Sequence, residues 1–458
     1  MSELLKFTEQ IGNLLWGWPM IVLLLGTHIF LTLRLKFPQR KIFKAIRLSV
    51  QKDEDSTGDI SQFGALTTSL AATIGTGNII GVATAISLGG PGAVLWCWLT
   101  GVFGIATKYG EGLLAIKYRQ KTDDGTILGG PMYALEKGLG CKWMAVLFCV
   151  FTAIATFGIG NAVQANAISE DITLLMEPIL SPHYTRLICG FVTATLVGSV
   201  IIGGVKNIAR WCTAIVPFMA LLYVLGCIYI LIVNHAYIPE ALRLIVDEAF
   251  STKAVGGGAV GSVMMVAARY GIARGLFSNE SGMGSAPIVA AAAQTRNPVR
   301  QALVSSTGTF WDTVVICAIT GLVVTTSILA YPEISQDQGG MLTKEAFGKV
   351  PYLGAPILTF GILTFSFSTI LGWSYYGERA MEYLFGKRSI ILYRIVYVLV
   401  VFLGSIMSLA MVWSLADIFN ALMAIPNLIS LLMLSGVIAK ETQHYLWNNH
   451  LDDNMEDD

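Results

Sequence analysis

Charged side chains are scarce in this sequence. Asp, Glu, Lys and Arg make up 13% of the 458 residues, and hydrophobic residues make up 54%. A typical soluble domain has about 25% charged residues. Basic and acidic residues balance at 30 each, so no overall charge favours nucleic acid as a partner. The composition excludes an ordinary soluble domain and indicates a protein embedded in the lipid bilayer.

Several functional signals are also missing. The seven cysteines form no C-x-x-C pair and have no histidine at metal-binding spacing, so we interpret them as small core residues. The opening "MSELLKFTEQIGNLLWGW" lacks the basic region and cleavage site of a signal peptide, so we expect the first apolar segment to be retained. The sequence contains no H-E-x-x-H motif, Ser–His arrangement or paired carboxylates, which argues against an enzyme.

Long apolar runs dominate what is present. A bilayer core about 30 Å thick needs about 20 helical residues to cross it. The pattern predicts an all-α integral membrane protein, residues 1–458 forming one domain, with eleven transmembrane helices. The predicted spans are 15–35, 63–87, 91–117, 143–168, 185–204, 211–233, 257–293, 302–329, 353–378, 391–413 and 416–438.

Basic residues gather in alternate connections between these spans. The links after the first, third, fifth, seventh and ninth spans are rich in Lys and Arg, whereas the others are poor in them or balanced by acids. Because Lys and Arg are enriched in cytoplasmic loops, we expect the N-terminus outside and the C-terminus inside. The sequence therefore predicts a multi-pass protein of the cell (inner) membrane.

The ten spans after the first divide into two sets of five. Since five is odd, the second set enters the membrane with opposite polarity, as in an inverted repeat. We expect residues 63–233 and 257–438 to form the two repeats, with one peripheral helix before them. The first helix of each repeat is interrupted, by "ATIGTGNIIG" and by the longer stretch "GGGAVGSVMMVAARYGIARGLFSNESGMGSAP". Matched interruptions of this kind point to a binding site near the bilayer midplane of a secondary transporter.

An unwound helix in lipid exposes N–H and C=O groups that protein, water or a bound solute must satisfy. Near Gly77 and Asn78 the first N–H groups of the resumed helix carry a partial charge of roughly +0.5, which suits a carboxylate. The carbonyls freed near Ala71 and Ile74 suit a small cation. Residues 63–85 contain no acid, so the sequence favours sodium over the proton as the coupling ion.

Other interpretations of these glycines stay open. Small residues also let two membrane helices pack closely, which is the usual meaning of a single such stretch. "GTGNIIG" is similar to a dinucleotide-binding loop, but its spacing differs and no strand precedes it. A channel needs a continuous file of sites rather than one cavity. A proton-coupled carrier and an ion channel are kept as alternatives.

Polar residues recur at membrane depth outside the first break. Gln164 lies one helical turn after Asn161, so both amides can face the interior or join helices together. "FSNESGMGSAP" places Phe277 and Asn279 at the second break.

"TFSFSTILGWSYYGE" provides Ser368 and Thr369, with Trp373 about one turn further along. Their hydroxyls can bind sodium while the indole limits side-chain size. Alternatively, each hydroxyl bonds to its own helix backbone.

Charged residues inside predicted spans need partners. Asp312 lies about ten residues into the span 302–329, and we expect Arg269 or Arg274 to pair with it. A proton relay through Asp312 is the alternative. We expect Lys108 and Glu111, like Glu378 and Arg379, near cytoplasmic helix ends, where long side chains reach the aqueous interface or pair at an inner gate.

With these motifs assembled, the chain resembles the alanine or glycine:cation symporter family, sodium-coupled amino-acid carriers similar in fold to the leucine transporter. The resemblance covers nearly the whole chain. It rests on "ALTTSLAATIGTGNIIGVATA", "FGIGNAVQANA", "GLFSNESGMGSAPI", "QALVSSTGTFWDT" and "LGWSYYGE", among others.

The resemblance implies that alanine or glycine enters with sodium by alternating access. It implies that Thr76 and Gly77 hold the carboxylate, that Gln164 and Trp373 line the pocket, and that sodium binds carbonyl and hydroxyl oxygens. The expected partners are a small neutral amino acid, co-transported sodium and the lipid bilayer. The expected substrate residues are Thr76, Gly77, Asn78, Gln164, Phe277, Asn279 and Trp373, and the expected sodium ligands are Ala71, Ile74, Ser368 and Thr369.

Overall fold

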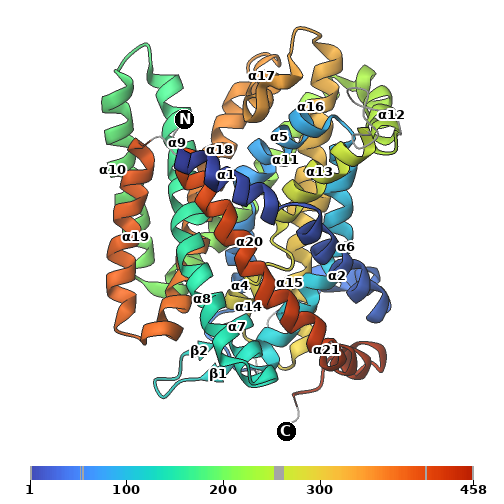
Figure 1. Ribbon diagram of the computed structural model, residues 1–458, viewed down its shortest axis with the longest axis vertical. Coiled ribbons are helices and arrows are strands. Elements are labelled where there is room, and N and C mark those ends of the chain that lie inside the picture. Colours follow the sequence, from blue (N-terminus) through green and yellow to red (C-terminus); the bar gives the residue numbers. More distant parts are fainter. Residues whose placement is uncertain (1–2, 52, 54–55, 252–262, 408–409, 456–458) are drawn as a thin grey trace.

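The computed structural model describes residues 3–51, 53, 56–251, 263–407 and 410–455. It is overwhelmingly helical, which confirms the predicted all-α class, and Figure 1 shows most long helices running along the long axis of the molecule. In the first half of the chain the elements are α1 (Glu3–Leu15), α2 (Trp18–Arg34), η1 (Pro38–Lys41), α3 (Ile42–Ser49), α4 (Gln62–Thr73), η2 (Gly77–Gly81), α5 (Val82–Gly89), α6 (Ala93–Lys117), β1 (Gln120–Lys121), β2 (Ile127–Leu128), α7 (Pro131–Tyr133), η3 (Ala134–Gly138), α8 (Lys142–Phe157), η4 (Gly158–Ala162), α9 (Val163–Met176), α10 (Pro182–Ile201) and α11 (Gly204–Val233). In the second half they are η5 (His235–Tyr237), α12 (Ile238–Ala249), α13 (Val263–Asn279), α14 (Ala286–Ala290), α15 (Pro298–Thr309), η6 (Phe310–Cys317), α16 (Ala318–Ala330), η7 (Gln336–Met341), α17 (Leu342–Gly348), α18 (Gly354–Phe385), α19 (Ser389–Ile406), α20 (Ala410–Met433), α21 (Ser435–Glu441) and η8 (Thr442–Trp447).

Several helices can cross a membrane by their length and composition. In the described chain there are seven, or up to nine if each of two bent helix pairs counts as one span. The protein is therefore a multi-pass membrane protein, whereas the count of eleven spans and the repeat stay predictions. The seven stretches are Lys142–Met176, Pro182–Ile201, Gly204–Val233, Pro298–Ala330, Gly354–Phe385, Ser389–Ile406 and Ser414–Met433, and the bent pairs are Trp18–Arg34 with Pro38–Ser49 and Gln62–Thr73 with Gly77–Gly89.

Two predicted spans have no counterpart in that set. The span 91–117 is occupied by α6, a helix of 25 residues that contains three charged side chains. The interrupted span 257–293 is occupied by α13 and α14. Its first residues, 257–262, lie outside the described residues, as do 408 and 409 of the span 391–413.

The two ends of the molecule carry different connections. In Figure 1, α12 and α17 lie at the upper end, and the N-terminus also lies in the upper half. The β1–β2 hairpin, α7, α21 and the C-terminus lie at the lower end. The hairpin is held to the turn between α18 and α19 by an ion pair of Asp124 with Lys387, which lowers the pKa of the Asp124 carboxyl. The β1–β2 hairpin and the turn between α18 and α19, both at the lower end, belong to connections that the sequence predicts to be cytoplasmic.

Local signals explain where the central helices begin. Ser61 caps α4, since its hydroxyl accepts the Gly64 N–H at 3.0 Å. Asn297 caps α15 in the same way through the Arg300 N–H, also at 3.0 Å, and Pro298 takes the first helical position.

Six of the seven cysteines are buried and all seven are free, which confirms their interpretation as core residues.

Helix α18 approaches α4 very closely just before the end of α4. A β-carbon added at Gly372 would lie 2.7 Å from the backbone nitrogen of Ala72, so only glycine permits this distance. The contact brings the hydroxyl groups of α18 next to the first predicted break.

Candidate functional site

The first predicted break is present. Helix α4 ends at Thr73, and Ile74 has extended backbone angles (φ −75°, ψ 92°). The chain becomes helical again at Gly77, in the π-helical turn η2, and continues into α5. The two halves differ in direction by 52°. A π-helical turn at a functional site is common because it widens the helix and frees backbone groups.

The second predicted break is also present. Helix α13 ends at Asn279, and α14 begins only at Ala286. Between them Glu280, Gly282 and Gly284 have positive φ angles of 53°, 90° and 84°. Glycine adopts such angles at little cost, whereas a glutamate does so only where its surroundings hold it.

The two broken helices touch each other. A β-carbon added at Gly77 would lie 3.4 Å from the Phe277 ring and 3.4 Å from Cα of Ser278. The start of the resumed first helix therefore faces the end of α13. Phe277, expected in the substrate site, contacts the first break in this way.

The four residues expected to bind sodium lie together. The Thr369 hydroxyl is 3.1 Å from the Ala71 carbonyl oxygen and 3.3 Å from that of Ile74. The Ser368 hydroxyl is 3.4 Å from the same Ala71 oxygen. Two carbonyls at the end of α4 and two hydroxyls of α18 thus form one group of hard oxygen ligands. This is the donor type with which interrupted transporter helices bind a small cation.

Gln164 and Thr76 form a second group beside the first. The Gln164 amide donates from Nε2 to the Thr76 hydroxyl at 3.1 Å. Its other end, Oε1, is buried and has no hydrogen-bond partner within the described chain. A β-carbon added at Gly75 would lie 3.5 Å from this Oε1 and 2.6 Å from the Thr369 hydroxyl. An unpaired acceptor therefore points to the break, between the two groups.

Trp373 lies on α18, one turn after Thr369, and only 1% of it is exposed. Its side chain packs on Gly160, where a β-carbon would lie 2.3 Å from that of the tryptophan. Gly160 comes four residues before Gln164, so the indole borders the segment that carries the unpaired amide oxygen. The indole N–H has no partner in the described chain. Trp373 therefore borders the segment that carries Gln164, and its part in the substrate site stays a prediction.

Asn78 and Asn279 make other contacts. The Asn78 side chain accepts the Gly75 N–H at 2.8 Å and donates to Asp312 Oδ1 at 2.7 Å. The Asn279 side chain accepts the Ser281 N–H and faces Thr100 of α6 at 3.4 Å. Both amides are thus used to shape the breaks, and the hydrogen bonds of Asn279 in the described chain go to Thr100 and Ser281.

The expected partner of Asp312 is wrong. Neither Arg269 nor Arg274 pairs with it in the described part of the chain. Its carboxylate accepts hydrogen bonds from Asn78 and from Ser278 at 3.1 Å and Thr313 at 2.6 Å. Neutral donors from both broken helices therefore satisfy this buried carboxylate without a neighbouring arginine.

Glu111 is buried, so it does not reach an aqueous interface, which was one of the two expectations for it. One carboxylate oxygen accepts the N–H groups of Gly282 and Gly284, each at 3.0 Å, and the Asn427 amide at 2.7 Å. Lys108, one turn earlier on α6, is buried too and interacts electrostatically with this carboxylate. Glu111 holds the unwound backbone of the second break. In the sequence, the only indication of this role was that Glu111 lies three residues after Lys108 inside an apolar segment, where buried charges need partners.

The arrangement can bind two ligands at one break. The cluster of Ala71, Ile74, Ser368 and Thr369 presents only oxygen atoms, whereas the segment from Thr76 to Gly77 presents the start of a helix beside an unpaired amide oxygen. A cation matches the first set of groups. A small molecule with both a carboxylate and an ammonium group matches the second.

Comparisons with known proteins identify the family that the chain resembles. A family model described as "Sodium:alanine symporter family" matches residues 1–457. The chain is 50% identical over 453 residues to the "Sodium/alanine symporter AgcS" of Methanococcus maripaludis, covering 97% of each chain. It is 49% identical over 452 residues to an "Uncharacterized transporter" of Haemophilus influenzae, covering 97% of each. It is 38% identical over 451 residues to the "Probable sodium/glutamine symporter GlnT" of Bacillus subtilis, covering 97% of this chain and 91% of the relative.

Proposed function

The chain belongs to the sodium:alanine symporter family, and from that premise we propose that it carries alanine or glycine into the cell together with sodium by alternating access. The family description and the names of two relatives support sodium-coupled amino-acid symport. One relative is named for alanine and another for glutamine, so the substrate of this chain is argued from its own site.

The sodium ion binds the cluster of two carbonyl and two hydroxyl oxygens at the end of α4. In this structure the Thr369 hydroxyl donates to the Ala71 carbonyl, whereas the Ser368 hydroxyl lies 2.9 Å from the Phe365 carbonyl oxygen of its own helix and 3.4 Å from that of Ala71. When the ion binds, the hydroxyl protons turn away and the oxygen lone pairs face the cation. The ion thereby fixes α18 against the end of α4.

The amino acid binds on the other side of the same break. Its carboxylate accepts the N–H groups of Thr76 and Gly77, at the start of the resumed helix, where the helix dipole favours negative charge. Its ammonium group donates to Gln164 Oε1, the buried acceptor without a partner. Trp373 and Phe277 bound the space for the side chain, which favours a hydrogen atom or a methyl group. Asn279 contributes by shaping the second break.

Coupling follows because both ligands use one flexible segment. Sodium orders the chain from Ala71 to Ile74, and the amino acid orders it from Thr76 onward. Each ligand therefore reduces the cost of ordering that the other must meet, which is a coupling free energy between two sites. We propose that this ordered state is the occluded one, formed within an eleven-helix protein whose repeats are residues 63–233 and 257–438.

The observation that carries this proposal is the unpaired Gln164 Oε1 beside the Thr369 hydroxyl at the first break. The test is uptake of labelled alanine into proteoliposomes under an imposed sodium gradient. We expect accumulation above the equilibrium level that collapses when the gradient is removed. Equal accumulation with a pH gradient and no sodium would support the proton-coupled alternative instead, and single-channel currents far above carrier turnover would support a channel.

A further inference from the structure

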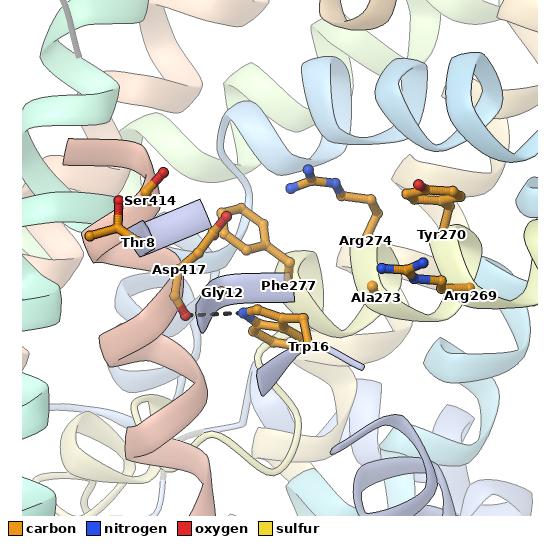
Figure 2. Close-up of a pocket in the computed structure, with 10 residues that line it drawn as sticks. All are labelled: Thr8, Gly12, Trp16, Arg269, Tyr270, Ala273, Arg274, Phe277, Ser414 and Asp417. Carbon is orange, nitrogen blue, oxygen red and sulfur yellow. Dashed lines mark hydrogen bonds between the residues drawn. The ribbon is translucent and has the colours of Figure 1, made fainter. Parts of the chain in front are cut away.

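The last helices of the chain are bound to other elements at both ends. Figure 2 shows Trp16 of α1 beside Asp417 near the start of α20, where the indole donates to the Asp417 backbone oxygen at 3.0 Å. Beyond α20, the Thr442 hydroxyl of η8 lies 3.0 Å from the Tyr109 hydroxyl of α6. The residues that follow η8 therefore start from a point that is held against α6.

Residues 450–455, here called the C-terminal segment, lie across the connection between α14 and α15. Asn297 Nδ2 donates to the backbone oxygens of Leu451 at 2.8 Å and of Asp453 at 2.9 Å. The Leu451 side chain is buried. The Oδ1 atom of the same asparagine accepts the Arg300 N–H and caps α15. One side chain therefore both starts α15 and holds the C-terminal segment.

Two arginines join the C-terminal segment to Asp53, which precedes α4. Arg300 Nη1 lies 2.7 Å from the Asp452 carboxylate, and its Nε lies 3.4 Å from the Asp53 carboxylate. Arg296 donates to the Asp452 backbone oxygen at 2.9 Å and to the Asp53 carboxylate at 2.6 Å. The Asp53 side chain is fully buried. Both arginines therefore lie between the C-terminal segment and the chain that leads into the first broken helix.

The chain before α4 also pairs with the chain after α14. The N–H groups of Asp59 and Ile60 donate to the Ala292 backbone oxygen at 2.8 and 3.1 Å, and the Gln294 N–H donates to the Ile60 backbone oxygen at 2.8 Å. These bonds join the two broken helices at the ends that the sequence predicts to face the cytoplasm. Under alternating access, release of the substrate into the cell requires these two ends to separate.

We propose that the C-terminal segment is a brace that keeps the cytoplasmic side of the protein closed. It fixes the connection between α14 and α15 to η8, so that the arginines of this connection keep their hold on Asp53. A freed C-terminal segment therefore shifts the population toward a state open to the cytoplasm. The inference rests on the proposed function for the direction of release, whereas the hold on Asp53 does not depend on any substrate.

The strength of the brace comes from its buried contacts. The Asp452 side chain is 87% exposed, and exposed ion pairs contribute little to stability. The hydrogen bonds from Asn297 and the buried Leu451 side chain are shielded from water, so they contribute more. Variants that test the brace should therefore change Asn297 or Leu451.

Hydrogen–deuterium exchange of the purified full-length protein tests the brace without requiring transport. Asn297→Asp still caps α15 but can no longer donate to the C-terminal segment. Leu451→Ala removes the buried contact and changes no charge. In both variants we expect the backbone amides of Asp59 and Ile60 to exchange about ten-fold faster than in the natural sequence, as for the loss of one or two hydrogen bonds.

Asp453→Asn is the matched control. It removes a charge from the same segment, but this carboxylate pairs with His450 at 2.8 Å, and the backbone oxygen that binds Asn297 is retained. Exchange at Asp59 and Ile60 should stay within about two-fold of the natural sequence. Thermal unfolding of each variant shows whether the fold is retained.

The second measurement is the dissociation rate of labelled alanine from the purified protein in the presence of sodium. We expect alanine to leave Asn297→Asp and Leu451→Ala about three-fold faster or more, because the state open to the cytoplasm is more populated. Unchanged exchange at Asp59 and Ile60 in the folded Leu451→Ala protein, or an equal increase in Asp453→Asn, would overturn the brace. Faster exchange without faster dissociation would overturn it as well. Absence of alanine binding in the natural sequence would contradict the proposed function instead, and the exchange result then decides the brace.

Discussion

Asn78 Nδ2 lies 2.7 Å from Asp312 Oδ1, so a hydrogen bond joins the first broken helix to η6. The same asparagine accepts the Gly75 N–H at 2.8 Å, and the same carboxylate accepts the Ser278 hydroxyl at 3.1 Å. One acidic side chain therefore connects the unwound backbone of the first break to the end of α13. Because hydrogen bonds to charged groups contribute about 1.5–3 kcal/mol each, the two breaks are held in a fixed relation.

This connection predicts that Asp312 affects both ligands without touching either. In Asp312→Asn a charged acceptor becomes a neutral carboxamide, so the bonds from Asn78, Ser278 and Thr313 lose their charge assistance. We expect the sodium concentration for half-maximal uptake and the KM for alanine both to rise by about ten-fold, as for one lost charge-assisted bond. Uptake at varied sodium and at varied alanine measures the two effects.

Thr313→Val, which removes only one donor to the same carboxylate, is the milder control for Asp312→Asn. A proton relay through Asp312 would give another result. The asparagine variant would then lose its response to an imposed pH gradient while its dependence on sodium stayed unchanged.

The Thr369 hydroxyl is predicted to be a sodium ligand. Thr369→Val keeps the shape of the side chain and removes the oxygen that lies 3.1 Å from the Ala71 carbonyl oxygen. We expect the half-saturating sodium concentration to rise by about ten-fold or more, because a hard cation loses one of its oxygen ligands. The control is Thr364→Val on the same helix, whose hydroxyl donates to the Phe360 carbonyl at 2.7 Å. Equal sodium curves for the two variants would remove Thr369 from the site.

Gln164 is predicted to accept the ammonium group of the substrate. Gln164→Leu removes the unpaired oxygen at similar volume, so the KM for alanine should rise by about ten-fold or more, the effect of a lost bond to a charged group. Asn166→Leu on the same helix is the control, because that amide donates to the Met407 carbonyl at 3.2 Å. It should reduce thermal stability and leave the KM for alanine nearly unchanged. An unchanged KM in Gln164→Leu together with a raised KM in Asn166→Leu would show that Gln164 does not contact the substrate.

Trp373 is predicted to limit the size of the substrate. Trp373→Ala opens space beside Gly160, so larger neutral amino acids should compete with labelled alanine and be transported. Gly160→Ala should abolish uptake or destabilise the protein, since the added methyl group would lie 2.3 Å from the Trp373 β-carbon. A competition panel on the tryptophan variant is the measurement, and an unchanged substrate profile would exclude Trp373 from the pocket.

Glu111 is predicted to stabilise the second break. Glu111→Ala leaves the Gly282 and Gly284 N–H groups and the Asn427 amide without their acceptor in a buried place. We expect a loss of about 3 kcal/mol or more of stability, from about 1–3 kcal/mol for each unsatisfied group, visible as a lower temperature of thermal unfolding. Glu441→Gln, which removes an ion pair with Lys117 at 3.3 Å near a helix end, should change stability by at most about 1 kcal/mol. Similar unfolding temperatures for the two variants would contradict this role.

The positions of the broken helices could be predicted from the sequence. Glycines at 75, 77, 282 and 284 inside apolar segments indicate that the helices unwind there, because glycine tolerates open backbone conformations and lets other chains approach. The oxygen ligands at the first break followed from the resemblance to a transporter family, and the structure places Ala71, Ile74, Ser368 and Thr369 together. Their roles stay predictions that the variants above test.

Helices α1 and α3 could not be predicted from the long apolar runs of the sequence. Both are amphipathic, so prediction from such runs assigned no helix to either. Their stability comes from packing one face on the core, and α1 packs along α20, where Trp16 donates to the Asp417 backbone oxygen. Hydropathy over a long window does not detect a helix with only one apolar face.

By itself the sequence determined the membrane class, the interrupted helices and the family, because these depend on composition, on glycine and on long contiguous motifs. Only the tertiary structure decided how the buried charges are satisfied. Asp312 was expected beside an arginine, yet hydroxyl and amide donors from two other helices surround it, and Glu111 holds a backbone 171 residues away. Hydrogen bonds between distant segments depend on how helices pack in three dimensions, and the spacing of residues along one chain does not contain that information.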